Sequence, residues 1–201
     1  MVLELNLILG PMFAGKSTYL INKVNEILSS GISESEILLI NHSSDVRYDT
    51  NKICSHNGNK INAISLTSLY DTITTIINNN FNNSCSNKTY KIQYIFIDEG
   101  QFFNDLHQSI TTLLQSFAKL DYILNLHIYI FGLDGDFKQK PFNNSRLLEL
   151  IPYATNILKL NAKCFKCNNI APFTKRIINS NDTILIGGAE DYQPTCLLHL
   201  H

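Results

Sequence analysis

The sequence lacks an excess of charge of either sign. Its 201 residues include 16 lysines and arginines and 17 aspartates and glutamates, for a formal net charge of −1. A protein that holds a nucleic-acid backbone needs a broad cationic surface, and this balance supplies none. We therefore expect no nucleic-acid partner. The hydrophobic fraction of 44% and the charged fraction of 16% are typical of an ordinary globular protein.

Long apolar runs are also missing. No run reaches the roughly 18 residues that a transmembrane helix needs. The first residues, MVLELNLILGPMF, contain neither a basic n-region nor a cleavage site. We therefore expect no membrane partner and a cytoplasmic location. The five cysteines are odd in number, and three of them lie in the last quarter of the chain, which favours a metal site over a disulfide framework.

Apolar patterning predicts strands that alternate with helices over roughly the first 150 residues. Short apolar runs typical of buried strands occur at residues 3–9, 37–40, 92–97 and 127–133. Apolar residues at helical spacing predict helices from Ser17 to the glycine at position 31, over residues 66–77 and over residues 106–117. We therefore predict an α/β fold in which a parallel sheet is flanked by helices and binds ligands at the carboxyl ends of its strands. The motif described below makes this fold P-loop NTPase-like.

Two segments lack this patterning. The polar residues 41–60 predict a long surface loop, and such loops are usually functional. The asparagine-rich residues 78–88 predict a flexible connection. After about Ile157 the pattern changes to short β-rich pieces with clustered cysteines. We therefore expect a P-loop domain at residues 1–156 and a small zinc-binding β lobe at residues 157–201.

A phosphate-binding motif follows the first predicted strand. The residues that match G-x-x-x-x-G-K-[ST] are Gly10, Pro11, Met12, Phe13, Ala14, Gly15, Lys16 and Ser17, and Thr18 comes next. The glycines allow backbone N–H groups and the helix N-terminus to hold phosphate oxygens. We expect Lys16 to reach the β- and γ-phosphates of ATP and Ser17 to bind Mg²⁺. The plainer interpretation is a glycine turn that carries a lysine by chance.

A pair of carboxylates ends the third predicted strand. Apolar residues run directly into Asp98 and Glu99. In a P-loop fold, an aspartate at this point commonly supports Mg²⁺, so we assign Asp98 to the metal. Glu99 is then free to act as a general base toward an acceptor hydroxyl. The alternative is a strand that merely ends in two surface carboxylates.

A second metal site is indicated near the C-terminus. Cys164 and Cys167 form a C-x-x-C pair, and Cys196 and His199 form a C-x-x-H pair. Four such ligands suit tetrahedral Zn²⁺ and leave no position for water, so the role of the zinc would be structural. His201 could compete as the fourth ligand, and the cysteines could also be unrelated buried thiols. The remaining cysteines, Cys54 and Cys85, stand alone and are expected to be bystanders.

Several motifs occur together in one order. They are GPMFAGKST, DVRY, IDEGQFF, LDGDFKQKPF, CFKC, FTKR and IGGAEDY followed by CLLH. In this combination the chain resembles the thymidine kinase family of cellular and poxvirus enzymes, over nearly its whole length. The resemblance implies ATP- and Mg²⁺-dependent phosphorylation of the thymidine 5′-hydroxyl to dTMP, in nucleotide salvage for DNA synthesis. It also implies a homotetramer, a lasso loop over the nucleoside, and feedback inhibition by dTTP.

The resemblance also implies roles for individual residues. Glu99 would be the base, with Asp45 and Arg47 of the DVRY segment near the hydroxyl and the transferred phosphate. Side chains implied to line the thymine pocket are Phe102, Leu133, Phe137, Phe142, Thr174 and Tyr192. The lasso residues implied to bind the base edge through the backbone are Leu185, Ile186, Gly187 and Gly188. Asp136 departs from the family pattern and would add a negative charge near the pocket.

A P-loop by itself also suits two other classes of protein. A nucleic-acid motor ATPase would carry a basic stripe of phosphate-contacting residues, and the nearly neutral charge balance counts against it. A GTPase-type switch would carry an N-K-x-D segment to read guanine, and the sequence contains none.

Overall fold

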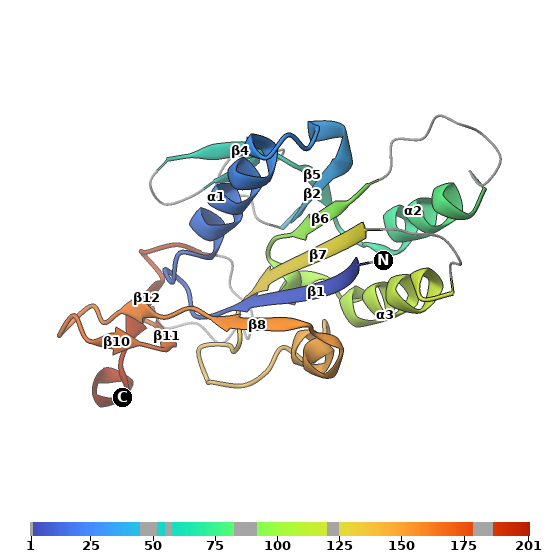
Figure 1. The fold of residues 1–201 in the computed structure, drawn as a ribbon. Helices are drawn as coiled ribbons and strands as arrows, with labels where there is room; N and C mark the ends of the chain where they lie inside the picture. Colours follow the sequence, from blue (N-terminus) through green and yellow to red (C-terminus); the bar gives the residue numbers. More distant parts are fainter. Residues whose placement is uncertain (1, 45–51, 55–57, 83–91, 120–124, 179–186) are drawn as a thin grey trace.

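The computed structural model describes residues 2–44, 52–54, 58–82, 92–119, 125–178 and 187–201 (Figure 1). Its α-helices are α1 (Lys16–Ser29), α2 (Tyr70–Asn82) and α3 (Leu106–Phe117). Its longer strands are β1 (Val2–Leu9), β2 (Ile37–His42), β6 (Tyr94–Ile97), β7 (Asn125–Gly132), β8 (Asn156–Lys159), β11 (Phe173–Arg176) and β12 (Tyr192–Thr195). The short strands are β3 (Lys52–Cys54), β4 (Lys60–Asn62), β5 (Ile64–Leu66), β9 (Ala162–Lys163) and β10 (Ile170–Ala171). Single 3₁₀ segments are η1 (Glu34–Glu36), η3 (Gly100–Phe102), η4 (Leu147–Tyr153) and η5 (Leu197–His199).

The central sheet has six strands in the order β5-β2-β6-β7-β1-β8. Every neighbouring pair in it is parallel. All of these strands therefore end at the same edge of the sheet, where β1 leads into the predicted phosphate loop and β6 leads into Asp98. Strand β7 lies between these two, so its C-terminal end at Gly132 faces the space between both motifs. The predicted α/β class and parallel sheet are confirmed.

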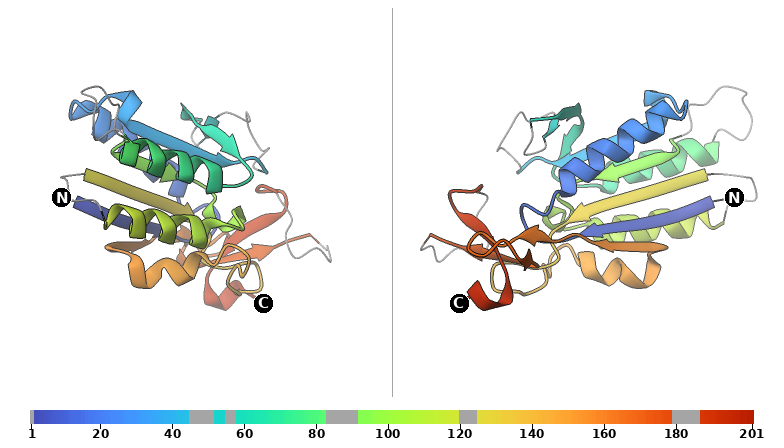
Figure 2. Two further views of the ribbon diagram at one scale, coloured as in Figure 1. Left: turned by 90° about the vertical axis from the view of Figure 1, so that its right-hand side faces the viewer. Right: turned by 60° about the vertical axis from the view of Figure 1, so that its left-hand side comes forward.

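Both faces of the sheet are covered because the strand side chains alternate. In β1, Leu5, Leu7 and Leu9 pack on one face against α2, α3 and η4, whereas Ile8 packs on the other face against α1. Figure 2 shows α2 and α3 together on one side of the sheet and α1 on the other. Burial on both faces explains why these strands read as continuous apolar runs.

The polar segment at residues 41–60 is not a loop throughout. Its first residues extend β2 to His42, and β3 pairs with β4 as an antiparallel hairpin. Ile53 in this hairpin is only 1% exposed and packs in the cluster that contains α1. The strands have three residues each, which is too short for an alternating pattern to stand out in the sequence. Residues 45–51 lie outside the described part of the chain.

Helix α2 begins and ends later than its predicted range of 66–77. Ser68 and Leu69 precede the helix, and the Asp105 carboxylate accepts the backbone N–H groups of Leu69 at 2.8 Å and Tyr70 at 2.9 Å. This cap, from a residue distant in the sequence, sets the start of the helix. The helix then continues to Asn82, so the first residues of the asparagine-rich segment are helical and only residues after them could form the expected connection. Residues 83–91 are outside the described ranges.

A small lobe follows the central sheet. It contains the hairpins β9–β10 and β11–β12, and it lies at the end of the sheet toward which β1 and β7 point (Figure 1). Phe13 and Ala14 of the phosphate loop pack against its buried cluster. Strand β8 pairs with β1, so the central sheet extends three residues past the predicted boundary at 156. The division into two domains itself stays a prediction.

Among the described residues, no helix has both the length and the apolar character needed to cross a membrane.

Candidate active site and metal centre

The phosphate loop has a backbone that only its glycines allow. A Cβ on Gly10 would lie 2.4 Å from the backbone oxygen of Leu160, so no larger residue fits where β1 turns toward α1. Gly15 has a φ of 86° and precedes the first residue of α1. Its left-handed conformation costs an L-residue more than it costs glycine. The loop therefore leads directly into the N-terminus of α1, where the helix dipole favours an anion.

Lys16 lies inside this loop. Its side chain is 9% exposed. The Nζ atom donates to the backbone oxygens of Gly10 at 3.0 Å and Pro11 at 2.8 Å. These two contacts hold the Lys16 side chain inside the loop.

The hydroxyl of Ser17 meets the carboxylate of Asp98. Ser17 Oγ donates to Asp98 Oδ2 over 3.2 Å, although 81 residues separate the two in the sequence. Asp98 is 3% exposed. A hydroxyl and a buried carboxylate at this distance form the oxygen donor set that Mg²⁺ prefers. The structure therefore joins the two motifs that the sequence assigned to one magnesium site.

Glu99 follows directly and adopts an unusual backbone conformation. Its φ of 52° and ψ of 40° are left-handed, which is uncommon for a residue other than glycine and clusters at functional sites. Its backbone N–H donates to Asp98 Oδ1 over 3.0 Å. The Glu99 carboxylate accepts a hydrogen bond from Gln101 Nε2 over 2.5 Å. The Asp98 carboxylate therefore accepts from Ser17, whereas the Glu99 carboxylate accepts from Gln101.

The predicted pocket residues fall into two contacting groups. The rings of Phe102 and Phe142 meet edge to face with centroids 6.4 Å apart. The Phe137 ring lies 3.8 Å below the Arg176 guanidinium, and Arg176 Nη2 donates to the Tyr192 hydroxyl over 2.8 Å. The Arg176 contacts join the loop after β7 to the β11–β12 hairpin of the small lobe.

Thr174 connects the small lobe with the phosphate loop. Its Oγ1 accepts the backbone N–H of Met12 over 2.9 Å, and the Thr174 side chain is buried. Strand β11 is therefore held at a fixed position relative to the predicted phosphate loop.

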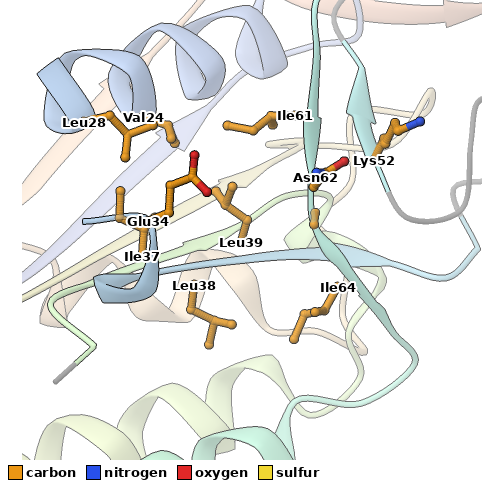
Figure 3. A pocket seen from close by; sticks show the side chains of 11 residues that line it. Val24, Leu28, Glu34, Ile37, Leu38, Leu39, Lys52, Ile61, Asn62 and Ile64 are labelled. Atoms are coloured by element: carbon orange, nitrogen blue, oxygen red, sulfur yellow. The ribbon is translucent and has the colours of Figure 1, made fainter. Parts of the chain in front are cut away.

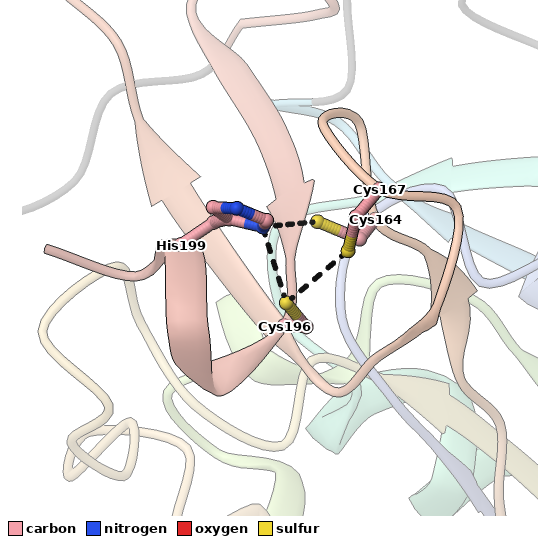
Figure 4. A group of neighbouring side chains, drawn as sticks. All are labelled: Cys164, Cys167, Cys196 and His199. Atoms are coloured by element: carbon pink, nitrogen blue, oxygen red, sulfur yellow. Dashed lines mark hydrogen bonds between the residues drawn. The ribbon is translucent and has the colours of Figure 1, made fainter.

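The four predicted metal ligands meet in the small lobe (Figure 4). The ligand atoms of Cys164, Cys167, Cys196 and His199 all lie within 4.8 Å of one another. Cys196 Sγ lies 3.6 Å from Cys167 Sγ and 3.3 Å from His199 Nδ1. A tetrahedral zinc with Zn–S bonds of about 2.3 Å separates its sulfurs by roughly 3.8 Å, so the four residues fit such an ion. They could hold a metal, and the cluster is formed by His199, not His201.

The thiols of this cluster differ in acidity. Burial raises the pKa of Cys164, but hydrogen bonds from backbone N–H groups and from His199 outweigh it and lower the pKa to about 5. A backbone hydrogen bond at Asn169 lowers the pKa of Cys167, yet burial and the neighbouring Cys196 and Cys164 raise it overall. Because thiolates so close together repel one another, a divalent cation among them would stabilise the fully ionised set.

The comparison with known sequences agrees with this architecture. A family model described as thymidine kinase matches residues 3–200. The chain belongs to the thymidine kinase family. A thymidine kinase of Oryza sativa subsp. japonica is 34% identical over 197 residues, which are 98% of this chain and 65% of that protein. The chain therefore spans just under two thirds of the rice relative.

Viral relatives have nearly the same length as the chain. The thymidine kinase of Sheeppox virus (strain KS-1) is 37% identical over 192 residues, or 96% of this chain and 93% of the relative. That of Vaccinia virus (strain Western Reserve) is 35% identical over 193 residues, or 96% and 94%. These matches confirm the predicted family and, with it, the predicted enzyme class of a kinase.

Some residues implied by the thymidine kinase family lie outside the described part of the chain. They are Asp45 and Arg47 of the DVRY segment and Leu185 and Ile186 of the lasso. Gly187 and Gly188, the last two of the predicted lasso residues, are described. The backbone oxygen of Gly188 accepts the N–H groups of Asp191 at 3.2 Å and Tyr192 at 3.0 Å, which ties this end of the lasso to β12.

The structure assigns a local task to Asp136, the departure from the family pattern. Its Oδ1 accepts the backbone N–H groups of Lys138 at 2.8 Å and Lys140 at 2.9 Å. The carboxylate therefore stabilises a turn in the loop after β7, where its charge is partly offset by two amides. The expected extra charge at the pocket is reduced accordingly.

Three residues with clear roles were absent from the predicted site. Gln101 contacts the Glu99 carboxylate, Arg176 bridges two aromatic side chains, and His42 stacks edge-on against Phe103 with centroids 4.6 Å apart. Gln101 and Arg176 lie within the motifs DEGQFF and FTKR, which was the available signal. The residues next to Gln101 and Arg176 in the sequence did not indicate which side chains these two residues contact.

A cavity of about 590 Å³ lies apart from these residues (Figure 3). It is lined by Val24 and Leu28 of α1, by strand β2 and by the region of the β3–β4 hairpin, and it shares no residue with the predicted site. Its walls are mainly aliphatic, with Glu34, Lys52 and Asn62 as its polar members. Without converging polar groups it lacks the features of a phosphate site.

Proposed function

We propose that the chain transfers the γ-phosphate of ATP to the 5′-hydroxyl of thymidine and so forms dTMP for nucleotide salvage. The observation that supports this most is the hydrogen bond between Ser17 and Asp98, because it brings the phosphate loop next to the carboxylate pair. A phosphate donor held by that loop would have its γ-phosphate near Glu99. The thymidine kinase family supplies the acceptor.

Protein groups can supply most of what phosphoryl transfer requires. Lys16 and the loop amides would offset the negative charge that develops on the phosphoryl oxygens. Ser17 and Asp98 would hold Mg²⁺, which neutralises charge on the β- and γ-phosphates when bound. Glu99 would accept the proton of the 5′-hydroxyl. Arg47 and Asp45 remain predicted partners of the same hydroxyl and phosphate.

The nucleoside would lie between the loop after β7 and the small lobe. Phe102, Phe142, Phe137 and Tyr192 offer flat apolar area for a pyrimidine. Thr174 and Leu133 would complete the walls, and the lasso backbone at residues 185–188 would bind the base edge. The contacts of Arg176 with Phe137 and Tyr192 support a pocket in this place.

Product identification tests this function directly. Purified protein with Mg-ATP and a panel of nucleosides should form a 5′-monophosphate from thymidine faster than from any purine nucleoside, because the aromatic walls suit a pyrimidine. Nucleoside products separated by chromatography and identified by mass provide the measurement. ATP hydrolysis stimulated by DNA, with no nucleotide product, would instead favour a motor ATPase.

We also propose that the Cys164 cluster binds one structural zinc. Elemental analysis of freshly purified protein should give about one zinc per chain, since the four ligands fill a tetrahedral shell. Cys164→Ser should lose the zinc and lower the melting temperature, because the small lobe has few other buried side chains. The matched control is Cys54→Ser, at a half-buried cysteine of β3. This variant should keep the zinc and a normal melting temperature. Active protein with far less than one zinc per chain would rule out this site.

The oligomeric state and the feedback inhibition implied by the family resemblance are also part of the proposal. We expect a homotetramer, feedback inhibition by dTTP, and a cytoplasmic location.

A further inference from the structure

Gln101 lies between the proposed base and the wall of the proposed nucleoside pocket. Its side chain is 2% exposed. The Nε2 atom donates to Glu99 Oε2 over 2.5 Å, and the Oε1 atom accepts the backbone N–H of Leu133 over 2.9 Å. Because the Leu133 N–H can only donate, it fixes the amide with its oxygen toward Leu133 and its NH₂ group toward Glu99.

We propose that Gln101 is a positioning residue that holds the Glu99 carboxylate in its reactive orientation and couples it to the pocket wall at Leu133. This inference rests on the proposed function of Glu99 as the base. Gln101 would act through Glu99, and no contact with either substrate is assigned to it.

The Gln101 hydrogen bond restrains the Glu99 side chain. Its backbone is set by the left-handed turn, but three side-chain torsions separate the carboxylate from that backbone. A general base must lie within hydrogen-bond reach of the proton that it accepts, and each unrestrained torsion lowers the fraction of time spent there. A hydrogen bond from a buried amide to an ionised carboxylate is stronger than one between neutral groups and restricts these torsions.

The end of β7 is built to admit the Gln101 amide. A Cβ on Gly132 would lie 3.0 Å from Gln101 Oε1 and 2.6 Å from Leu147 Cδ2. A larger residue would therefore displace the amide or its neighbour. The glycine leaves the space in which Gln101 reaches the next backbone N–H, that of Leu133.

This arrangement links nucleoside binding at Leu133 to the position of the Glu99 carboxylate. A nucleoside that packs on Leu133 presses on the same short segment that anchors Gln101. The backbone of that segment therefore helps to set the position of the base. Because Gln101 is buried and would act through Glu99, its loss should affect the chemical step more than substrate binding.

The test is Gln101→Met, which removes both hydrogen bonds and keeps a side chain of similar length. We expect kcat to fall by about 10²-fold, as for a small misplacement of a catalytic group. The KM values for thymidine and ATP should change by less than about threefold, which marks an effect on the reacting state alone. The matched control is Gln93→Met: Gln93 also donates from Nε2 to a glutamate, Glu36, but at the other end of the sheet. Its kinetics should stay normal.

A double variant separates this proposal from the proposed function. If Gln101 acts through Glu99, then Glu99→Gln with Gln101→Met should have the kcat of Glu99→Gln alone. A loss that multiplies the two single effects would overturn the positioning role, as would near-normal kcat in Gln101→Met. Near-normal turnover of Glu99→Gln would instead contradict the base itself.

A second substitution covers the case in which Gln101→Met does not fold. Gln101→Asn keeps a polar amide at this position, but its side chain is one methylene shorter and cannot reach both Glu99 Oε2 and the Leu133 N–H. We expect the same loss of kcat with little change in KM. Normal kcat in this variant would overturn the proposal.

Discussion

Glu99→Gln should lower kcat by about 10² to 10⁴-fold, which is the usual contribution of a general base. The amide cannot accept the proton of the 5′-hydroxyl, whereas its size and its contact with Gln101 can be kept. The KM values for ATP and thymidine should therefore remain close to normal. Steady-state kinetics with both substrates varied, together with binding measured at equilibrium, provide the check.

Glu36→Gln is the matched control for this substitution. Glu36 also accepts a hydrogen bond from a glutamine amide, that of Gln93, but it is the last residue of η1, directly before β2. Its replacement should leave kcat unchanged. Should Glu99→Gln turn over at a normal rate, Glu99 would not be the base and a different acceptor of the proton would be needed.

Lys16→Met should lower kcat/KM for ATP by about 10² to 10³-fold, the scale seen when one donor to a developing anion is removed. In the structure its ammonium contacts the backbone oxygens of Gly10 and Pro11, so it lies within the loop that would hold the phosphates. Methionine keeps most of the buried length but carries no charge. Initial rates at varied Mg-ATP, with circular dichroism to confirm folding, measure the effect.

Lys23→Met provides the comparison on the same helix. Lys23 lies nearly two turns further along α1 and pairs with Glu26 at 3.0 Å on a solvated surface. Such pairs contribute little to stability, so this variant should have normal kinetics and nearly normal stability. Equal losses in both variants would show that general charge, and not the position of Lys16, accounts for the effect.

The contact between Thr174 and Met12 suggests how the two halves of the site work as one. A backbone N–H of the phosphate loop is satisfied by a hydroxyl of the small lobe. Phe13 and Ala14 pack against the same lobe, whose buried cluster includes Cys164 and Cys196. A metal that orders these cysteines would therefore also steady the phosphate loop. Loss of zinc in Cys164→Ser is accordingly expected to weaken ATP binding as well as stability.

Local sequence motifs gave the phosphate loop and the carboxylate pair, because each is a continuous segment with a fixed geometry. The glycines, lysine and serine of the loop need only one strand and one helix to take up their positions. The four metal ligands were likewise found from paired spacings. Helix α3 agreed with its predicted range because its apolar residues repeat over three full turns.

Other features had no local signal. The β3–β4 hairpin consists of two three-residue strands, and its place in the core depends on the contact of Ile53 with α1. The start of α2 depends on a cap from Asp105, which is distant in the sequence. Residue preferences likewise do not predict the left-handed backbone of Glu99, because glutamate rarely adopts this conformation.

By itself, the sequence determined the fold class, the family, the phosphate motif and the identity of the four candidate metal ligands, since spacing along the chain carries that information. Only the tertiary structure decided that β7 separates the strands of the two motifs, that Ser17 nevertheless meets Asp98, and that Gln101 joins Glu99 to Leu133. The physical reason is that these contacts depend on strand order and on close packing at the sheet edge. Neither property is encoded in any single segment of the chain.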